Sequence, residues 1–230
     1  MQKYANWYIF RNIFFLQVVD PRRIDDLKEK MYRNIKCLIF TKTKNMRALL
    51  VIDMQRGSFT DATPRYDTAG VTGRINQLAA YFRASGNMVV FIQHDGTAQG
   101  DFLPRSEPWM LLPGLISAET DRYIAKTAND CFYRSALGAL LEAGGIKEVV
   151  ITGCATDFCV DTTVKSALHA DFTVKVAADA HTTADREGIS AAQVIGYYNW
   201  IWSKMLPVFS GGLQVMTTKD IIAEILVISG

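Results

Sequence analysis

One cysteine stands where its thiol could act as a nucleophile. Residues 149–160 read Val-Val-Ile-Thr-Gly-Cys-Ala-Thr-Asp-Phe-Cys-Val, a pattern typical of a buried strand, a turn at Gly153 and the start of a helix. Cys159 falls at that helix start, where unpaired backbone N–H groups and the positive end of the helix dipole favour an ionised sulfur. The segment therefore predicts a thiolate nucleophile at Cys159.

Charged and histidine side chains stand at the ends of other predicted strands. Because the carboxyl ends of parallel strands meet at one edge of a sheet, ligands collect there. We therefore expect the carboxylate of Asp53, the amine of Lys126 and the thiol of Cys159 to meet in one crevice. Two histidines and two further aspartates are expected at the same edge: His94, Asp95, Asp179 and His181.

The elements that must position these groups alternate, from Met46 onward, between short apolar runs and longer helical periods. Near-continuous apolar runs are typical of parallel strands covered on both faces. The pattern predicts an α/β fold with three α/β/α layers around a Rossmann-like, doubly wound, mostly parallel sheet. Strands are predicted over residues 48–53, 87–94, 123–125, 148–153, 173–178 and 213–217, and helices over 69–85, 135–143, 157–169, 190–205 and 219–227.

Three segments taken together resemble the signature segments of the isochorismatase-like cysteine hydrolases. They are Val-Ile-Asp-Met-Gln at 51–55, Ile-Ala-Lys-Thr at 124–127 and Val-Ile-Thr-Gly-Cys-Ala-Thr-Asp-Phe-Cys-Val at 150–160. Their order, spacing and strand context are specific in combination, and the resemblance runs from about Met46 to Thr217.

The resemblance implies a triad of Asp53, Lys126 and Cys159 on a parallel six-stranded sheet. Asp53 would take the thiol proton and return it to a leaving amine, and Lys126 would stabilise thiolate and carboxylate together. Backbone N–H groups of Ala155 and Cys159 could bind the oxyanion, aimed by a cis peptide between Cys154 and Ala155 that the resemblance also implies. The predicted reaction is hydrolysis of a C–N, amide-type bond of a small molecule through an acyl-enzyme.

Other interpretations stay open. A cysteine after a strand can be a small buried apolar residue, which is how Cys154, Cys131 and Cys37 are interpreted. His94 or His181 could pair with the thiol, as in the usual thiol hydrolases. The chain could also be a catalytically silent binding module of this fold, or an ether hydrolase like isochorismatase itself, which resembles the family but lacks the nucleophilic cysteine.

No metal or cofactor is expected. The nicotinamidase branch of the family that this chain resembles is metal-dependent and uses an aspartate with two nearby histidines, whereas here His94 has no second histidine before His169. No G-x-G-x-x-G motif follows the first strand, which argues against a dinucleotide-binding oxidoreductase.

A pocket with aromatic walls and a few polar contacts is expected around the triad, which suits a small, partly apolar amide. The loop over residues 96–114 is the expected lid and specificity element, with a passive surface loop as the alternative. The expected substrate-binding residues are Gln55, Phe59, Gln93, His94, Trp109 and Phe158, with Tyr133 as a further candidate.

Composition favours small-molecule chemistry. The chain has 230 residues, of which 49% are apolar and 21% charged, and a net charge of +2, which permits a large core and argues against binding of nucleic acid. The apolar run over residues 13–19 is too short to cross a bilayer, so no membrane partner is expected. Four cysteines without disulfide spacing indicate a reducing, cytoplasmic setting.

The composition changes near Met46. Residues 1–45 are interpreted as an N-terminal appendage, or as an upstream translation of a gene that begins at Met46, and residues 46–230 as a single hydrolase domain. Within that domain, residues 194–202 are apolar or aromatic nearly all round a predicted helix, which favours a homo-oligomer interface.

Overall fold

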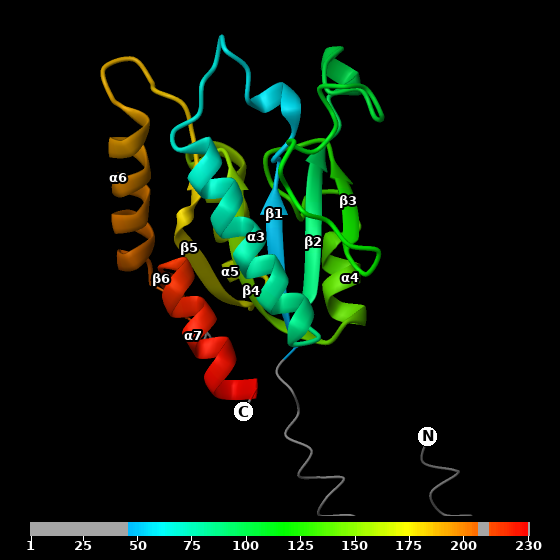
Figure 1. The fold of residues 1–230 in the computed structure, drawn as a ribbon, viewed down its shortest axis with the longest axis vertical. Coiled ribbons are helices and arrows are strands. Elements are labelled where there is room, and N and C mark those ends of the chain that lie inside the picture. Colours follow the sequence, from blue (N-terminus) through cyan, green and yellow to red (C-terminus); the bar gives the residue numbers. More distant parts are fainter. Residues whose placement is uncertain (1–45, 207–211, 230) are drawn as a thin grey trace, which may run out of the picture. The chain divides into compact units, whose positions relative to one another are not determined.

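Six parallel strands form the centre of the structure (Figure 1). The structure is a computed structural model that describes residues 46–206 and 212–229; the predictions on residues 1–45, Cys37 included, lie outside this range. The strands lie in the order β3-β2-β1-β4-β5-β6. They are β1 (Met46–Ile52), β2 (Met88–His94), β3 (Arg122–Lys126), β4 (Ile146–Cys154), β5 (Thr173–Thr182) and β6 (Leu213–Met216).

The central strands are apolar because both of their faces are covered. All residues of β1 after Met46 are buried. Leu50 pairs with Ile151 of β4, and Val51 pairs with Phe91 of β2. Such runs are what a parallel sheet between two layers of helices requires, and the predicted three-layer α/β fold is confirmed.

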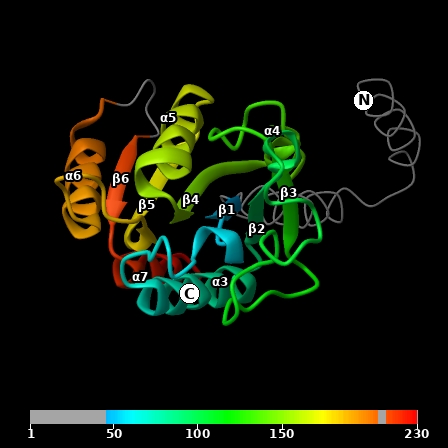
Figure 2. The same ribbon diagram turned by 90° about the horizontal axis from the view of Figure 1, so that it is seen from above.

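Helices lie on both faces of the sheet (Figure 2). Leu50 and Ile52 of β1 belong to a core shared with α4, α5 and α6, whereas Leu49 and Val51 belong to a second core shared with α3 and α7. Alternate residues of one strand therefore serve two layers. The helices are α3 (Thr68–Ala84), α4 (Leu137–Ala143), α5 (Asp161–His169), α6 (Ala191–Lys204) and α7 (Thr218–Ser229), with 3-10 turns η2 (Arg56–Ser58) and η3 (Thr97–Gln99).

The helical segment after β4 differs from its prediction. One helix is predicted over residues 157–169, but a π-helical turn, η4 (Thr156–Val160), precedes α5. The N–H groups of Phe158 and Val160 both donate to the carbonyl oxygen of Ala155, at 3.1 Å. Single π turns occur mostly inside helices at functional sites, and no sequence period distinguishes one from an α turn.

Strand β5 is longer than predicted. Its pairing with β4 is regular up to Ile151 and then shifts, so that His181 lies opposite Gly153 and Thr182 lies opposite Cys154. His181 is therefore part of the sheet beside the end of β4, whereas the sequence predicts it beyond the end of its strand.

Gly153 is the position of closest approach between β4 and β1. Its φ is 115°, and a Cβ added there would overlap the main-chain N, C and O of Ile52. We predict that Gly153→Ala lowers the free energy of unfolding by about 3 kcal/mol or more, because it adds strain and a backbone clash. Urea unfolding measures this change.

The matched control is Gly196→Ala in α6, where an added Cβ meets nothing within 4 Å. This substitution should stabilise the protein by about 1 kcal/mol, since alanine is the better helix former. Equal effects of the two substitutions would contradict the proposed close approach.

Candidate active site

The three residues of the predicted triad come together at the carboxyl edge of the sheet. The ammonium nitrogen of Lys126 lies 2.7 Å from Oδ2 of Asp53 and 3.3 Å from Sγ of Cys159. It also donates to the carbonyl oxygen of Ala128 at 2.9 Å. The three N–H donors of the lysine are thus matched to three acceptors.

Each side chain reaches this point from a different segment. Asp53 directly follows β1 in a left-handed conformation with φ 47°, which aspartate tolerates better than most residues, and its N–H donates to the carbonyl oxygen of Ile92 in β2 at 2.8 Å. Lys126 is the last residue of β3, and Cys159 lies on η4 after β4. From β1, the strand order first runs to one edge of the sheet through β2 and β3, and then to the other edge from β4 onward. β1 and β4 therefore flank the switch point, where ligands usually bind in such folds.

Burial and charge act in opposite directions on Lys126. Burial alone would lower the pKa of its ammonium group, but the charge of Asp53, with smaller contributions from Cys131 and Cys159, raises this pKa above its usual range. The side chain of Lys126 is 0% exposed and that of Asp53 is 7% exposed. Lys126 is therefore a permanent cation at neutral pH.

The thiol of Cys159 departs from the sequence prediction. Burial raises the pKa of Cys159, the neighbouring carboxylate of Asp53 raises it further, and Lys126 lowers it by less than these two raise it. The balance of these effects favours a neutral thiol beside an ion pair at rest, in the opposite direction to the thiolate that the sequence predicts. Position at a helix start favours the thiolate, but desolvation beside a carboxylate outweighs it.

The other two cysteines of the described residues are buried and unreactive. Burial raises the pKa of Cys131 and that of Cys154 to about 12, and both are free thiols with at most 2% exposure. Both therefore have the structural character that the sequence predicts for them.

The turn after β4 is held by side chains on β5 and beyond. The peptide bond between Cys154 and Ala155 is cis, as the family resemblance implies. One residue past Thr156, the carboxylate of Asp157 accepts hydrogen bonds from Thr183 Oγ1 at 2.6 Å and from Arg186 Nε at 2.7 Å. Burial would raise the pKa of Asp157, but the hydrogen bonds from Arg186 and Thr183 lower it, so Asp157 stays ionised.

His181 lies on β5, contacts this turn through Thr156 and is not a partner of the thiol. Its Nδ1 lies 2.9 Å from Oγ1 of Thr156, and its Nε2 lies 3.0 Å from Oδ1 of Asn199 on α6. Both ring nitrogens are thereby occupied, and burial lowers the pKa of His181 to about 4. His94 is half-buried and packs edge-on against Phe102. Within the described residues neither histidine ring hydrogen-bonds to Cys159.

Two expected substrate-binding residues hold a loop instead. Nε2 of Gln55 donates to the carbonyl oxygens of His94 and Trp109, and Nε2 of Gln93 also donates to that of Trp109. Both side chains are almost completely buried. They attach the end of the predicted lid to the strand ends, and their direct contact with substrate stays a prediction.

The aromatic candidates differ in exposure. Phe59 packs partly buried against the α3 and α7 core, while Phe158 is 49% exposed with the guanidinium of Arg186 5.2 Å from its ring centre. Tyr133 is 51% exposed. Trp109 is half-buried, and its Nε1 has no hydrogen-bond partner within residues 46–206 and 212–229. Phe158 and Tyr133 are thus the candidates open to a ligand.

Sequence reasoning missed Asn129. Its Oδ1 lies 3.6 Å from Sγ of Cys159, and the side chain is exposed. The signal that could have found it is its position three residues after Lys126, in the loop that turns back so that Ala128 contacts the ammonium group. It is the polar side chain from the site entrance that reaches the thiol.

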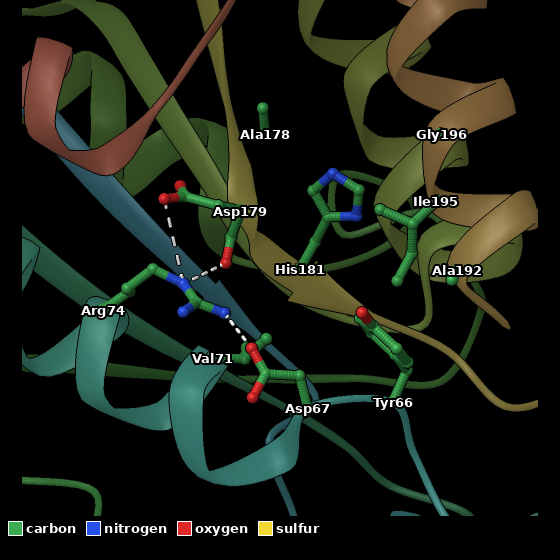
Figure 3. A pocket seen from close by; sticks show the side chains of 10 residues that line it. All are labelled: Tyr66, Asp67, Val71, Arg74, Ala178, Asp179, His181, Ala192, Ile195 and Gly196. Atoms are coloured by element: carbon green, nitrogen blue, oxygen red, sulfur yellow. Dashed lines mark hydrogen bonds and ion pairs between the residues drawn. The ribbon is translucent and has the colours of Figure 1, made fainter.

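A cavity of about 350 Å³ lies between α3, β5 and α6 (Figure 3). Its lining contains Tyr66, Arg74, Asp179, His181 and Ile195, but none of the triad residues. Arg74 points into it and bridges Asp67 to the carbonyl oxygen of Asp179.

The described residues contain neither a metal-binding cluster nor a membrane-spanning helix. No three histidine, cysteine, aspartate or glutamate side chains gather there as a metal site, and the metal-independent reaction stays a prediction. No helix in the same residues has the length and apolar character needed to cross a membrane.

The fold and the site define an α/β protein with a thiol, a carboxylate and an ammonium group at the carboxyl edge of its sheet. A family model described as the isochorismatase domain matches residues 47–196. The chain belongs to the isochorismatase family, as its three signature segments predict.

Relatives in this family carry hydrolase names. The chain is 33% identical over 140 residues to a streptothricin hydrolase of Streptomyces noursei, covering 61% of this chain and 51% of that protein. It is 26% identical over 194 residues to the ureidoacrylate amidohydrolase RutB of Variovorax paradoxus, covering 67% and 77%. A crystal structure of an isochorismatase family protein has 30% identity and a TM-score of 0.67, covering 74% and 98%. The chain spans about half the length of the streptothricin hydrolases that it matches.

Burial of His181 makes stability depend on pH. Because its pKa is lowered from 6.5 to about 4 in the folded state, the unfolded chain binds a proton first as the pH falls. The contribution of the neutral ring is thus complete above about pH 6.5 and is lost as the pH falls toward 4. We predict that the unfolding free energy of the wild type falls by on the order of 3 kcal/mol more than that of His181→Gln between pH 7 and pH 4.

Urea unfolding at several pH values measures both proteins. His181→Gln is the matched control because it keeps every other titrating group. Parallel curves for the two proteins would contradict the assignment of a buried neutral histidine.

Proposed function

We propose that the protein hydrolyses a C–N, amide-type bond of a small molecule, with Cys159 as nucleophile, Asp53 as proton carrier and Lys126 as the fixed cation. The observation that carries this proposal is the position of the Lys126 ammonium, 2.7 Å from the carboxylate and 3.3 Å from the sulfur. A buried cation between a proton acceptor and a thiol stabilises the charge that moves between them.

The reaction begins from the neutral thiol. Asp53 accepts the proton of Cys159 as the sulfur attacks the amide carbonyl carbon, so the negative charge passes from the carboxylate to the carbonyl oxygen. Oδ1 of Asp53 is buried and accepts no hydrogen bond within the described residues, which suits it to take the proton. Lys126 stays charged throughout and compensates whichever group is anionic.

The tetrahedral intermediate then collapses. Backbone N–H groups of Ala155 and Cys159, on either side of the first residues of η4, bind the oxyanion. Protonated Asp53 gives its proton to the departing nitrogen, which leaves a thioester on Cys159. Asp53 next removes a proton from water, and the hydroxide attacks the thioester to release the acid and restore the thiol.

The choice of an amide rests on chemistry and on the relatives. A thiol nucleophile with a proton carrier suits acyl transfer, and two relatives are named as an amidohydrolase and a streptothricin hydrolase. Exposed Phe158 and Tyr133 would offer aromatic surface to the apolar part of the substrate. The ether-hydrolase and silent-module alternatives stay open to the same experiment.

We predict a covalent acyl adduct on Cys159. Incubation with a panel of small amides, followed by acid quench and peptide mass spectrometry, should add the acyl mass to the Cys159 peptide. Cys131 and Cys154 should stay unmodified, because their side chains are buried away from any ligand, with at most 2% exposure. Cys159→Ala should lose turnover by at least about 10³-fold, the scale expected on removal of a nucleophile.

Cys131→Ala is the matched control, since it removes a fully buried thiol from the core that Cys159 packs against, and it should keep turnover within a few-fold. Turnover that survives in Cys159→Ala would reject the thiol mechanism. A wild type that neither turns over nor forms an adduct with any amide would instead favour the silent module.

A homo-oligomer in a cytoplasmic, reducing setting completes the proposal. Tyr197 and Trp200 on α6 are 56% and 58% exposed, with their rings stacked at 6.2 Å, and α6 carries no charged residue before Lys204. We predict that Trp200→Glu reduces the mass measured by light scattering at micromolar concentration, whereas Lys204→Glu at the end of the same helix does not. A wild type of monomeric mass would remove this part of the proposal.

A further inference from the structure

Thr156 and His181 form a buried pair directly behind the turn that carries the proposed oxyanion site. Oγ1 of Thr156 lies 2.9 Å from Nδ1 of His181, and the two residues are 0% and 1% exposed. Thr156 stands between Ala155 and the nucleophile, as the first residue of η4. Its side chain is therefore placed to fix the backbone from which both proposed oxyanion donors project.

Thr156, His181 and Asn199 are linked in series by hydrogen bonds, and the donor at each link can be deduced from Asn199. Nδ2 of Asn199 donates to the carbonyl oxygen of Ala178 at 2.9 Å, so its Oδ1 faces His181 as an acceptor. Nε2 of His181 must then carry the proton that it donates to Asn199, at 3.0 Å. Nδ1 is left as an acceptor, and the hydroxyl of Thr156 donates to it.

The imidazole is held rigidly in that orientation. The register shift in β5 puts His181 opposite Gly153, and the ring of Trp202 packs edge-on against it with centroids 5.2 Å apart. Nε1 of Trp202 donates to Oδ1 of Asp161, the first residue of α5, at 3.0 Å. Figure 3 shows the ring between β5 and α6, at the wall of the cavity.

We propose that His181 is a positioning residue of the reaction, which acts through the hydroxyl of Thr156 to set the direction of the Ala155 and Cys159 N–H groups. This inference rests on the proposed function. Two other anchors hold the residues on either side of Thr156. The carbonyl oxygen of Ala155 accepts from the N–H groups of Phe158 and Val160, and the carboxylate of Asp157 accepts from Arg186. The hydroxyl of Thr156 holds the residue between them.

Displacement of the turn would reduce the acceleration of acyl transfer and leave ground-state binding unchanged. Oxyanion donors act on charge that develops in the transition state, so their loss lowers the rate constant and leaves the half-saturating concentration nearly constant. If the role of the histidine were only structural, its substitution would lower thermal stability without a selective loss of the rate constant.

The test uses the burst of p-nitrophenolate when Cys159 is acylated by p-nitrophenyl acetate. The sulfur forms the thioester bond as the ester C–O bond breaks, and p-nitrophenolate leaves with the electron pair. We expect Thr156→Val to lower the acylation rate constant by about 10-fold to 100-fold, with a half-saturating concentration within twofold of the wild type. Thr156→Ser, which keeps the hydroxyl, should retain most of the rate.

Two substitutions of His181 form a matched pair. In His181→Asn, Oδ1 takes the position of Nδ1 and can still accept from Thr156. In His181→Gln, the terminal amide takes the position of Nε2, and the contact with Thr156 is lost. Both substitutions remove the ring, so we expect similar losses of melting temperature, but only His181→Gln should lose acylation rate as Thr156→Val does.

The double variant Thr156→Val, His181→Gln should be no slower than either single variant, because both changes remove the same contact. Equal rates for His181→Asn and His181→Gln, or losses that multiply in the double variant, would overturn the inference. A wild type whose burst equals that of Cys159→Ala would reject the proposed function itself, whereas a normal burst in Thr156→Val rejects only the role of His181.

Discussion

The side chain of Lys126 is completely buried, and an ammonium group taken out of water must be compensated by nearby charge and hydrogen-bond acceptors. Asp53, Cys159 and the carbonyl oxygen of Ala128 supply that compensation, and they come from the ends of β1, β4 and β3. The cluster can therefore form only when these strands are paired in register. The same requirement explains the electrostatic state of the site. One carboxylate neutralises the lysine, while burial and the same carboxylate raise the pKa of the thiol beside the pair.

The turn from β4 into η4 is held at each residue by contacts with other segments or with η4 itself. The carbonyl oxygen of Ala155 accepts two N–H groups from η4, the hydroxyl of Thr156 meets His181, and the carboxylate of Asp157 is bound by Arg186. Each of these three consecutive residues thus has partners of its own. Gly153 begins the turn, in a conformation and at a distance from β1 that exclude a side chain. Such dense anchoring keeps backbone donors in place before a substrate arrives, which is the condition for electrostatic catalysis.

Much of the fold and part of the site could be predicted from the sequence. Short β-branched runs, four of them almost continuously apolar, indicated all six strands, and placement at strand ends brought Asp53, Lys126 and Cys159 to one edge. The register shift of β5 could not be predicted, because the bulge depends on pairing with β4, and so the place of His181 in the sheet was missed. The amides of Gln55 and Gln93 also differ from expectation, since the main-chain acceptors that occupy them come from a distant loop. Asn129 escaped notice because nothing in its neighbouring residues shows that the chain turns back to the thiol.

The sequence by itself determined the order of strands and helices, the family and the three side chains of the predicted triad, because periodicity and short motifs are local properties of a chain. Only the tertiary structure revealed the burial and charge that raise the pKa of Cys159, and the hydrogen-bond partners of His181. A pKa depends on desolvation and on charges from other segments, and these exist only once the chain is folded. Local position at a helix start favours a thiolate, whereas burial beside Asp53 raises the pKa of the sulfur and favours a neutral thiol.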